Sequence, residues 1–375
     1  MSVLAGLRVL ELAAIGPAPW AAMLLADMGA DIVRIDRPGP TPKPTPTTRG
    51  RTNVQLDLKS PQGVQAAREL VAGADVLLEG MRPGVLERLG LAPEECWRIN
   101  PALVIGRMTG WGQNGPMADR AGHDINYIAL NGVLHSIGRD KPVPPLNLVA
   151  DFGGGGTFLL IGVLSAVLSA RETGKGRVVD ASMVEGSASM MTLIYERLMQ
   201  DRWRDERGVN ALDGGVPWYD VYETKDGRYM AVGCNEPQFY RIFVTALGLD
   251  PAALPERDQR SQWPVLREQF AARFAQRTRE AWTATFEPLD ACVTPVLSML
   301  EAPLHPHNVA RASYRKFEGH VVPGPAPRFD GLDGALAEPR PTLTAEAAAA
   351  RWPMRSRSAP TQPQAANGPD AKEHR

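Results

Sequence analysis

Cysteine is scarce in this chain: three occur among 375 residues, and they are far apart, in no metal-ligand spacing. Cys96, Cys234 and Cys292 therefore predict neither a zinc site nor a disulfide framework, and no metal ligands are assigned. A few small buried thiols are typical of a reduced cytoplasmic protein.

Net charge and long apolar runs are lacking as well. The chain has 41 basic and 42 acidic residues, a net charge of −1, so no global field favours nucleic acid or an acidic membrane surface. We find no run of 18 apolar residues, which argues against a membrane-spanning helix. The N-terminus lacks the basic segment of a signal peptide, and the C-terminal AKEHR is not a peroxisomal address. The expected location is the cytoplasm, without nucleic-acid or membrane partners.

The first half of the chain alternates short β-branched runs with helical segments, which predicts a doubly wound α/β domain. The expected strands are Leu7–Ala13, Asp31–Asp36, Asp75–Glu79 and Ala102–Arg107. The expected helices are Pro17–Asp27, Pro61 to about Ala72, Asp124–Ser136 and Thr157–Arg171.

The first turn of this domain does not favour a dinucleotide. Asp36 lies about 20 residues after Gly16, as in dinucleotide-binding folds. The turn itself reads Ile15-Gly16-Pro17-Ala18-Pro19, however, and lacks the further glycines that let a backbone approach a pyrophosphate. A nicotinamide or flavin cofactor is therefore not expected.

The second half of the chain has a different sequence pattern. Lys225-Asp226-Gly227 separates two short strands and predicts a β-hairpin, and helices follow at 237–247 and within 262–286. We expect a large domain over 1–199, an inserted small α+β domain over 200–310, a return to the large domain over 311–352 and a disordered tail over 353–375. The Pro- and Thr-rich stretch 38–50 is expected to be an exposed loop.

Two titratable residues beside glycines stand out in the stretch between these halves. His123 follows Gly122, and Asp151 directly precedes four consecutive glycines. A base and an acid placed in this way are suited to the opposite faces of a small substrate carbon. An Asp before glycines is also a common helix N-cap, and both roles are compatible.

These stretches resemble the alpha-methylacyl-CoA racemase family, which belongs to the formyl-CoA transferase (class III CoA-transferase) superfamily. The resemblance covers about residues 5–330. It is carried by the strings GLRVLELAAIGP, ADMGADIVRIDRPG, LLEGMRPGVLERLGL, TGWGQNGP, AGHDINYIALNGVLHSIGR, NLVADFGGGG, TGKGRVVDASMVEG and DACVTPVL.

The resemblance implies a Rossmann-like large domain, a small domain and a homodimer of two interlocked chains. Active sites would lie between the large domain of one subunit and the small domain of the other. The implied activity is inversion of the 2-methyl-bearing carbon of an acyl-CoA thioester, a step of lipid metabolism. It would proceed by 1,1-proton transfer through an enolate, with no cofactor, coenzyme A being part of the substrate.

The resemblance also assigns roles to residues. His123 and Asp151 would be the two proton-transferring groups, Glu236 would orient His123, and the N–H of Asp124 would stabilise the enolate oxygen. Glu236 also fits a plain helix N-terminus. Residues at the positions that contact or line the coenzyme A path are Arg37, Leu56, Lys59, Gly80, Arg82, Arg88, Gly122 and Tyr127.

Two other functions compete with this interpretation. In a CoA-transferase of the same superfamily, Asp151 would be a nucleophile that forms an acyl anhydride. The His at position 123 and the shortness of the glycine-rich stretch Leu212–Val216 argue against it. A non-catalytic acyl-CoA-binding protein is the other alternative, and the presence of His123, Asp151 and Glu236 together argues against that.

Overall fold

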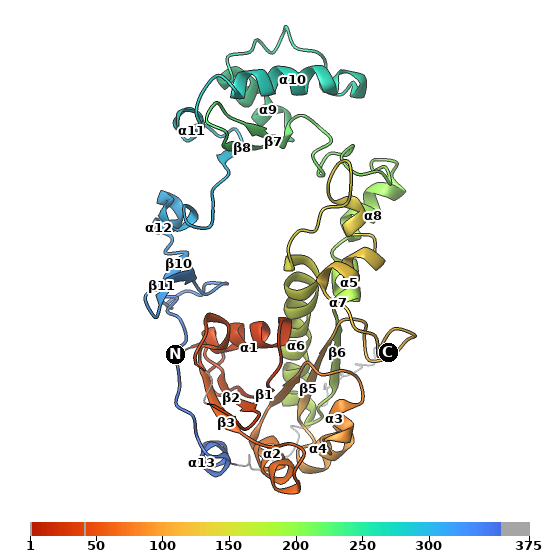
Figure 1. Cartoon of the computed structure of the whole chain (residues 1–375), viewed down its shortest axis with the longest axis vertical. Helices are drawn as coiled ribbons and strands as arrows, with labels where there is room; N and C mark the ends of the chain where they lie inside the picture. Colours follow the sequence, from red (N-terminus) through yellow and green to blue (C-terminus); the bar gives the residue numbers. More distant parts are fainter. Residues whose placement is uncertain (1, 41–42, 354–375) are drawn as a thin grey trace, which may run out of the picture. The chain divides into compact units, whose positions relative to one another are not determined.

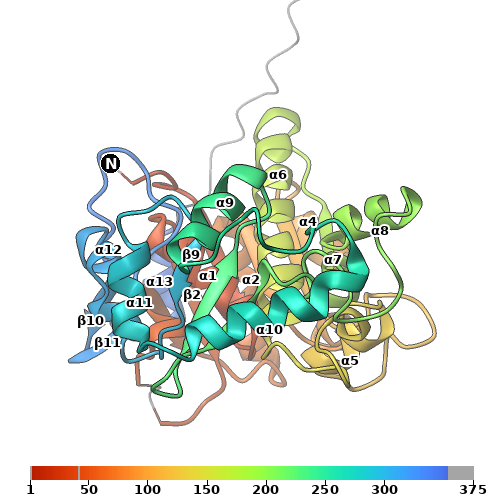
Figure 2. The same cartoon turned by 90° about the horizontal axis from the view of Figure 1, so that it is seen from above.

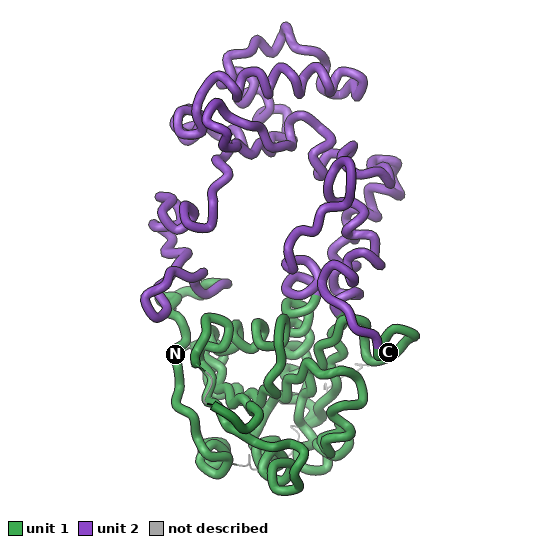
Figure 3. The backbone as a smooth tube through the Cα atoms, in the orientation of Figure 1, with its two compact units in different colours: residues 1–119, 155–182, 327–375 green, residues 120–154, 183–326 purple. Residues whose placement is uncertain are grey.

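The computed structural model describes residues 2–40 and 43–353. It separates into two compact units (Figure 3). Unit 1 comprises residues 1–119, 155–182 and 327–375, and unit 2 comprises 120–154 and 183–326. These groupings do not coincide with the expected domains 1–199, 200–310 and 311–352, which stay a prediction. Nearly all of the expected tail lies outside the described residues.

Unit 1 is built on a six-stranded sheet whose strands all pair in parallel. The spatial order is β3-β2-β1-β4-β5-β6, the order of a Rossmann-like doubly wound sheet. The α/β prediction is therefore confirmed. The strands are β1 Arg8–Leu12, β2 Asp31–Asp36, β3 Arg51–Gln55, β4 Val76–Glu79, β5 Val104–Thr109 and β6 Val178–Ser182.

Helices cover both faces of this sheet (Figure 1). Strands buried on both faces are nearly continuous apolar runs, as β4 is. One face packs against α2 (Pro61–Gly73), α4 (Pro93–Ile99) and α13 (Ala345–Ala350). Helices α1 (Pro17–Asp27) and α6 (Thr157–Thr173) pack on the other.

Local signals fix where these helices begin. Pro17 occupies the first turn of α1, where its missing N–H costs nothing. The Ser60 hydroxyl accepts the N–H of Gly63 and caps α2, and Thr344 caps α13 in the same way through Ala347. The N–H of Leu343 donates to the Asn53 carbonyl at 2.9 Å, so the segment before α13 lies against β3.

One helical segment passes a length and composition test for crossing a membrane. It runs over Leu148–Thr173, 26 residues that include an 18-residue window with a mean hydropathy of 1.7. This criterion tolerates interrupting polar residues, whereas the sequence-based expectation concerned an uninterrupted run of 18 apolar residues, which this segment does not contain. Leu159 and Val163 are nonetheless buried, and α6 packs against β5 and β6 as a layer helix of the α/β sheet does.

Unit 2 contains a three-stranded antiparallel sheet, and helices pack on one of its faces (Figures 1 and 2). The expected hairpin is confirmed, with Gly227 in its turn at φ 69°. The sheet consists of β7 Tyr219–Glu223, β8 Tyr229–Gly233 and β9 Val293–Pro295, and the helices are α9 Pro237–Ala246, α10 Trp263–Phe274 and α11 Arg279–Phe286.

Unit 2 also contains shorter elements, among them η4 Arg260–Gln262, which directly precedes α10. The others are α5 Asp124–Leu130, η2 Leu134–Ser136, η3 Leu148–Gly156 (which continues into unit 1), α7 Met183–Ser189, α8 Thr192–Met199, η5 Ala302–Leu304, α12 Pro306–Ala310, β10 Tyr314–Phe317 and β11 His320–Pro323. The helix expected over Asp124–Ser136 is shorter than predicted, because Gly132 takes a φ of 88° after α5.

The Pro- and Thr-rich stretch 38–50 is only partly an exposed loop. It contains the short helix η1 (Pro46–Thr48), and its last residues, Arg49 and Gly50, are buried. Arg49 pairs there with Asp27, its Nε lying 2.8 Å from the carboxylate. Burial of a charged side chain at this place depends on a partner distant in sequence, which the local pattern does not reveal.

Candidate active site

Asp151 lies in an unusual backbone conformation. The stretch Leu148–Gly156 is a nine-residue π-helix, with Asp151 in its first turn and α6 following directly. π-Helical turns are rare and are found frequently at functional sites. Asp151 is therefore not the N-cap of α6, which is the plain role that the sequence also allowed.

Close packing explains why glycine follows Asp151. A Cβ added to Gly154 would lie 2.4 Å from the backbone nitrogen of Ser187 in α7. A Cβ added to Gly186 would lie 1.9 Å from the carbonyl oxygen of Gly154. The backbones of η3 and α7 approach each other here more closely than any side chain permits. The glycines thus hold the segment that carries Asp151 against α7.

The first turn of α5 carries the next candidate residues. His123 is the N-cap residue, with an extended backbone, and its N–H donates to Asn126 Oδ1 at 3.0 Å. Its side chain is exposed, whereas Asp124, the first helical residue, is buried. The first N–H groups of an α-helix have no partner within the helix, so the Asp124 N–H points outward from the helix start.

The Asp124 carboxylate joins α5 to η3. Its Oδ2 accepts the N–H of Ala150 at 2.7 Å and the N–H of Asp151 at 2.8 Å. The side chains of His123 and Asp151 are also close enough to interact electrostatically. Four sequence-predicted residues, His123, Asp124, Tyr127 and Asp151, are thereby brought together.

Surroundings favour a protonated form of Asp151. Burial raises the pKa of its carboxyl above the ordinary value, and the neighbouring Asp124 carboxylate raises it further. A hydrogen bond from Asn147 and a positive charge on His123 act in the opposite direction. Burial, followed by the charges of Asp151 and Asp124, also raises the pKa of the Tyr127 phenol. A half-buried carboxyl with a raised pKa is suited to take up and release a proton.

Asn147 is a site residue that sequence reasoning missed. Its Nδ2 donates to Asp151 Oδ2 at 3.0 Å, which orients the carboxyl group. The sequence signal, an Asn four residues before the Asp, is weak because such pairs are common on helices.

Six of the predicted coenzyme A residues belong to unit 1 and gather at the carboxyl edge of its sheet. Arg37 directly follows β2, Leu56 follows β3 and Gly80 follows β4. Lys59 and Arg82 are exposed in the next turns, and Arg88 ends α3 (Val85–Arg88). Ligands of open α/β sheets bind at this edge, near the point where the strand order reverses, here between β1 and β4.

A buried ion pair supports the turn after β4. Glu79 Oε1 accepts Arg107 Nε at 2.7 Å, and Glu79 Oε2 accepts the N–H of Met81 at 2.6 Å. Arg107 also pairs with Glu87, at 2.7 Å, one residue before Arg88. Burial raises the pKa of the Glu79 carboxyl, and these hydrogen bonds oppose that shift. The network fixes the backbone on both sides of Gly80 and Arg82.

Glu236 is not joined to the His123 cluster within one chain. It is exposed and forms the N-cap of α9. Among the described residues, no hydrogen bond or ion pair links it to His123. Gly122 lies beside His123 and is half-buried. The part of the chain that the structure describes contains no group of three His, Cys, Asp or Glu side chains that would hold a metal ion.

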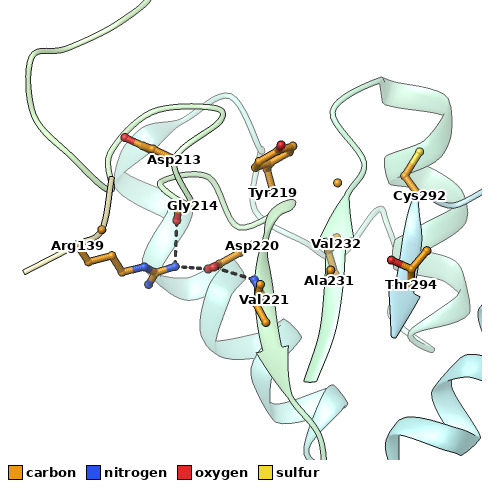
Figure 4. Close-up of a pocket in the computed structure, with 12 residues that line it drawn as sticks. Arg139, Asp213, Gly214, Tyr219, Asp220, Val221, Ala231, Val232, Cys292 and Thr294 are labelled. Carbon is orange, nitrogen blue, oxygen red and sulfur yellow. Dashed lines mark hydrogen bonds and ion pairs between the residues drawn. The ribbon is translucent and has the colours of Figure 1, made fainter. Parts of the chain in front are cut away.

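A pocket of about 540 Å³ lies elsewhere in unit 2, against β7, β8 and β9 (Figure 4). Arg139 donates to the Gly214 carbonyl at 3.0 Å and pairs with Asp220, which Arg267 also contacts. Cys292 and Thr294 lie on its other side. Asp213 in its lining accepts the N–H groups of Asn210 and Gly215, and His123, Asp124 and Asp151 do not line the pocket. The pocket is therefore separate from the candidate site.

Comparison with known proteins identifies the family of the chain. The model of CoA-transferase family III matches residues 4–347. The chain is 46% identical over 327 residues to the alpha-methylacyl-CoA racemases of Mus musculus and Homo sapiens, covering 87% and 86% of this chain and 85% and 86% of those proteins. The crystal structure of a CAIB/BAIF family protein from Brucella suis is similar with a TM-score of 0.78 and 25% identity, covering 93% of this chain and 98% of that one.

Proposed function

This chain belongs to CoA-transferase family III, and we propose that it is a racemase that inverts the 2-methyl-bearing carbon of 2-methylacyl-CoA thioesters. The observation that carries the proposal is the cluster of His123, Asp124 and Asp151. It places an exposed imidazole beside a half-buried carboxyl whose pKa is raised. A two-base proton transfer at carbon needs one group that accepts a proton and a second group that donates one to the opposite face.

The proposed reaction is a 1,1-proton transfer. One of the two groups, His123 or Asp151, removes the α-proton, and the electrons of the C–H bond move to the thioester oxygen to form an enolate. The N–H of Asp124 stabilises that oxygen. The other group then donates a proton to the opposite face of the same carbon. No redox step occurs, so the reaction needs no cofactor.

Coenzyme A is proposed to bind at the carboxyl edge of the unit 1 sheet. Arg37, Lys59, Arg82 and Arg88 provide exposed positive charges suited to its phosphates, and an Arg also stacks on a purine. Leu56, Gly80, Gly122 and Tyr127 would line the path of the chain between the phosphates and the thioester.

The proposed assembly is a homodimer of interlocked cytoplasmic chains, each with an inserted small domain. Glu236 lies outside the His123 cluster of its own chain. In the proposed dimer, the small domain of one subunit supplies Glu236 to His123 of the other. A carboxylate accepting the ring N–H would orient the imidazole and raise its basicity.

The test of the function is proton NMR of a 2-methylacyl-CoA incubated with the protein in deuterated water, without an acceptor acid. We expect loss of the α-proton signal and appearance of both epimers. Absence of exchange, with coenzyme A moving to a carboxylic acid once one is supplied, would identify Asp151 as the nucleophile of a transferase instead.

A further inference from the structure

We propose that the buried Asp124 carboxylate is a positioning residue, which fixes Asp151 opposite the substrate by holding the main-chain N–H groups of Ala150 and Asp151. This inference rests on the proposed function and concerns the Asp124 side chain, a group distinct from the Asp124 N–H assigned to the enolate oxygen. Both hydrogen bonds connect residues 26 and 27 positions apart, so they link two separate elements.

The burial of this side chain is the first argument. Asp124 is 4% exposed, and its Oδ1 is buried without a hydrogen-bond partner among the described residues. A buried carboxylate oxygen without a partner costs about 1–3 kcal/mol or more. The N-cap of α5 is His123, and the Asp124 carboxylate accepts N–H groups of η3, so it is not the cap of its own helix. The buried charge therefore acts on η3.

The geometry of the two accepted bonds is the second argument. Both donors belong to η3, whose π-helical backbone displaces Asp151 from the path of a regular α-helix. Asn147 orients the Asp151 side chain, whereas Asp124 holds the Asp151 main chain. The carboxyl group is thus fixed from two sides. A catalytic group displaced by about 1 Å can lose about 100-fold in rate, so such fixing is functionally valuable.

The charge of Asp124 has a second consequence for its neighbour. The groups whose charges act on Asp151 are His123 and Asp124 at the start of α5, and Asp151 and Asp124 in turn act on Tyr127. Helix α7, which packs against α5, carries Glu185, and that side chain is exposed. Removal of the Asp124 charge should therefore lower the pKa of Asp151, whereas loss of helix capping alone should not.

The test compares Asp124→Asn, Asp124→Ala and a control, Asp75→Asn, in the NMR exchange assay over a range of pH. Asp75 also accepts a main-chain N–H, that of Arg8 at 2.9 Å, but it lies at the amino end of the sheet. We expect Asp124→Ala to lower kcat by about 100-fold. Asp124→Asn keeps an acceptor oxygen and should lower kcat less, with the acidic limb of its pH–rate profile moved to lower pH. Asp75→Asn should leave that limb in place.

A double variant tests the proposal even if the single Asp124 variants are less stable than the wild type. When Asp151 is already replaced by Asn, adding Asp124→Asn should cause little further loss of residual exchange, because Asp124 acts through Asp151. The proposal is overturned if the acidic limb of Asp124→Asn matches the wild type, or if the two substitutions lower exchange independently. Absence of exchange by the wild-type protein would refute the proposed function itself.

Discussion

At the scale of single residues, the raised pKa of Asp151 makes a prediction about stability. Ionisation of this carboxyl costs more in the folded chain than in the unfolded one. The protonated Asp151 carboxyl therefore stabilises the folded chain fully at a pH below the ordinary carboxyl pKa. This stabilisation is lost as the pH rises through the raised pKa of the folded chain. Asp151→Asn, which stays neutral, should unfold at a higher urea concentration than the wild type at neutral pH, and the difference should vanish in acid.

The control for this measurement is Glu172→Gln, which neutralises an exposed carboxylate near the end of α6. Its urea midpoint should follow the wild type at both pH values. If Asp151→Asn is no more stable than the wild type at neutral pH, then the surroundings of Asp151 do not disfavour its charge.

The two-base assignment makes a sharper prediction than loss of activity. If His123 and Asp151 serve opposite faces of the α-carbon, each single variant should lose inversion by a factor of about 100 or more. Each should nevertheless retain some deuterium exchange with the epimer that the remaining base faces. His123→Gln and Asp151→Asn should therefore exchange opposite epimers in the NMR assay. Retention of wild-type inversion by either variant would contradict the assignment.

Sequence reasoning singled out His123 and Asp151 because each lies beside glycine, whereas the N–H of Asp124 was assigned only through the family resemblance. It did not identify Asn147 or the role of the Asp124 carboxylate. Both depend on contacts that form only when α5 and η3 come together, and a contact across 26 residues leaves no local pattern. The roles of His123, Asp151 and Glu236 stay predictions until the variants are measured.

At the scale of elements, Gly154 is where the approach of η3 to α7 is most easily tested. Gly154→Ala places a methyl group 2.4 Å from backbone that is held inside a helix. We expect a loss of about 1–3 kcal/mol in the free energy of unfolding, measured in urea, together with a lower kcat because Asp151 moves with η3. Gly39→Ala is the matched control, since its added Cβ meets nothing within 4 Å. Equal stability of the two variants would show that η3 has room to move.

The elements that sequence predicted well are those with strong local signals. The bounds of α1 and β2 match the expectation, as Pro17 sets the helix start and β-branched residues form the strand. Strand β3 was not predicted, because Arg51, Asn53 and Gln55 make it polar. Arg51 is buried there by its ion pair with Glu11 of β1, at 2.9 Å. The π-helix was not predicted either, since its glycines conceal any periodic pattern.

At the scale of the whole molecule, the strand order of the sheet explains why residues distant in sequence lie at one edge, where coenzyme A is proposed to bind. Parallel strands bring the ends of β2, β3 and β4 to the same edge, where the turns carry Arg37, Lys59 and Arg82. The alternating pattern of the sequence was sufficient to predict the α/β class. The same pattern does not determine how the chain divides into domains, because contacts between residues distant in sequence decide which segments pack together.

The proposed dimer makes the last prediction. If one subunit supplies His123 and the other supplies Glu236, then His123→Ala and Glu236→Ala homodimers are each inactive. A heterodimer of the two variants has one site with both defects and one intact site. Co-expression of the variants should therefore restore about a quarter of wild-type inversion, because about half of the randomly paired dimers are mixed and each has one active site.

The matched control is co-expression of His123→Ala with Asp151→Ala, both of which lie in the same cluster of one chain. Mixed dimers of this pair have one defect in each site, so inversion should not return. Recovery with Glu236→Ala but not with Asp151→Ala would place the site across the subunit boundary. If neither mixture restores inversion, although differently tagged chains verify that mixed dimers form, then Glu236 either acts within its own subunit or has no role in the mechanism.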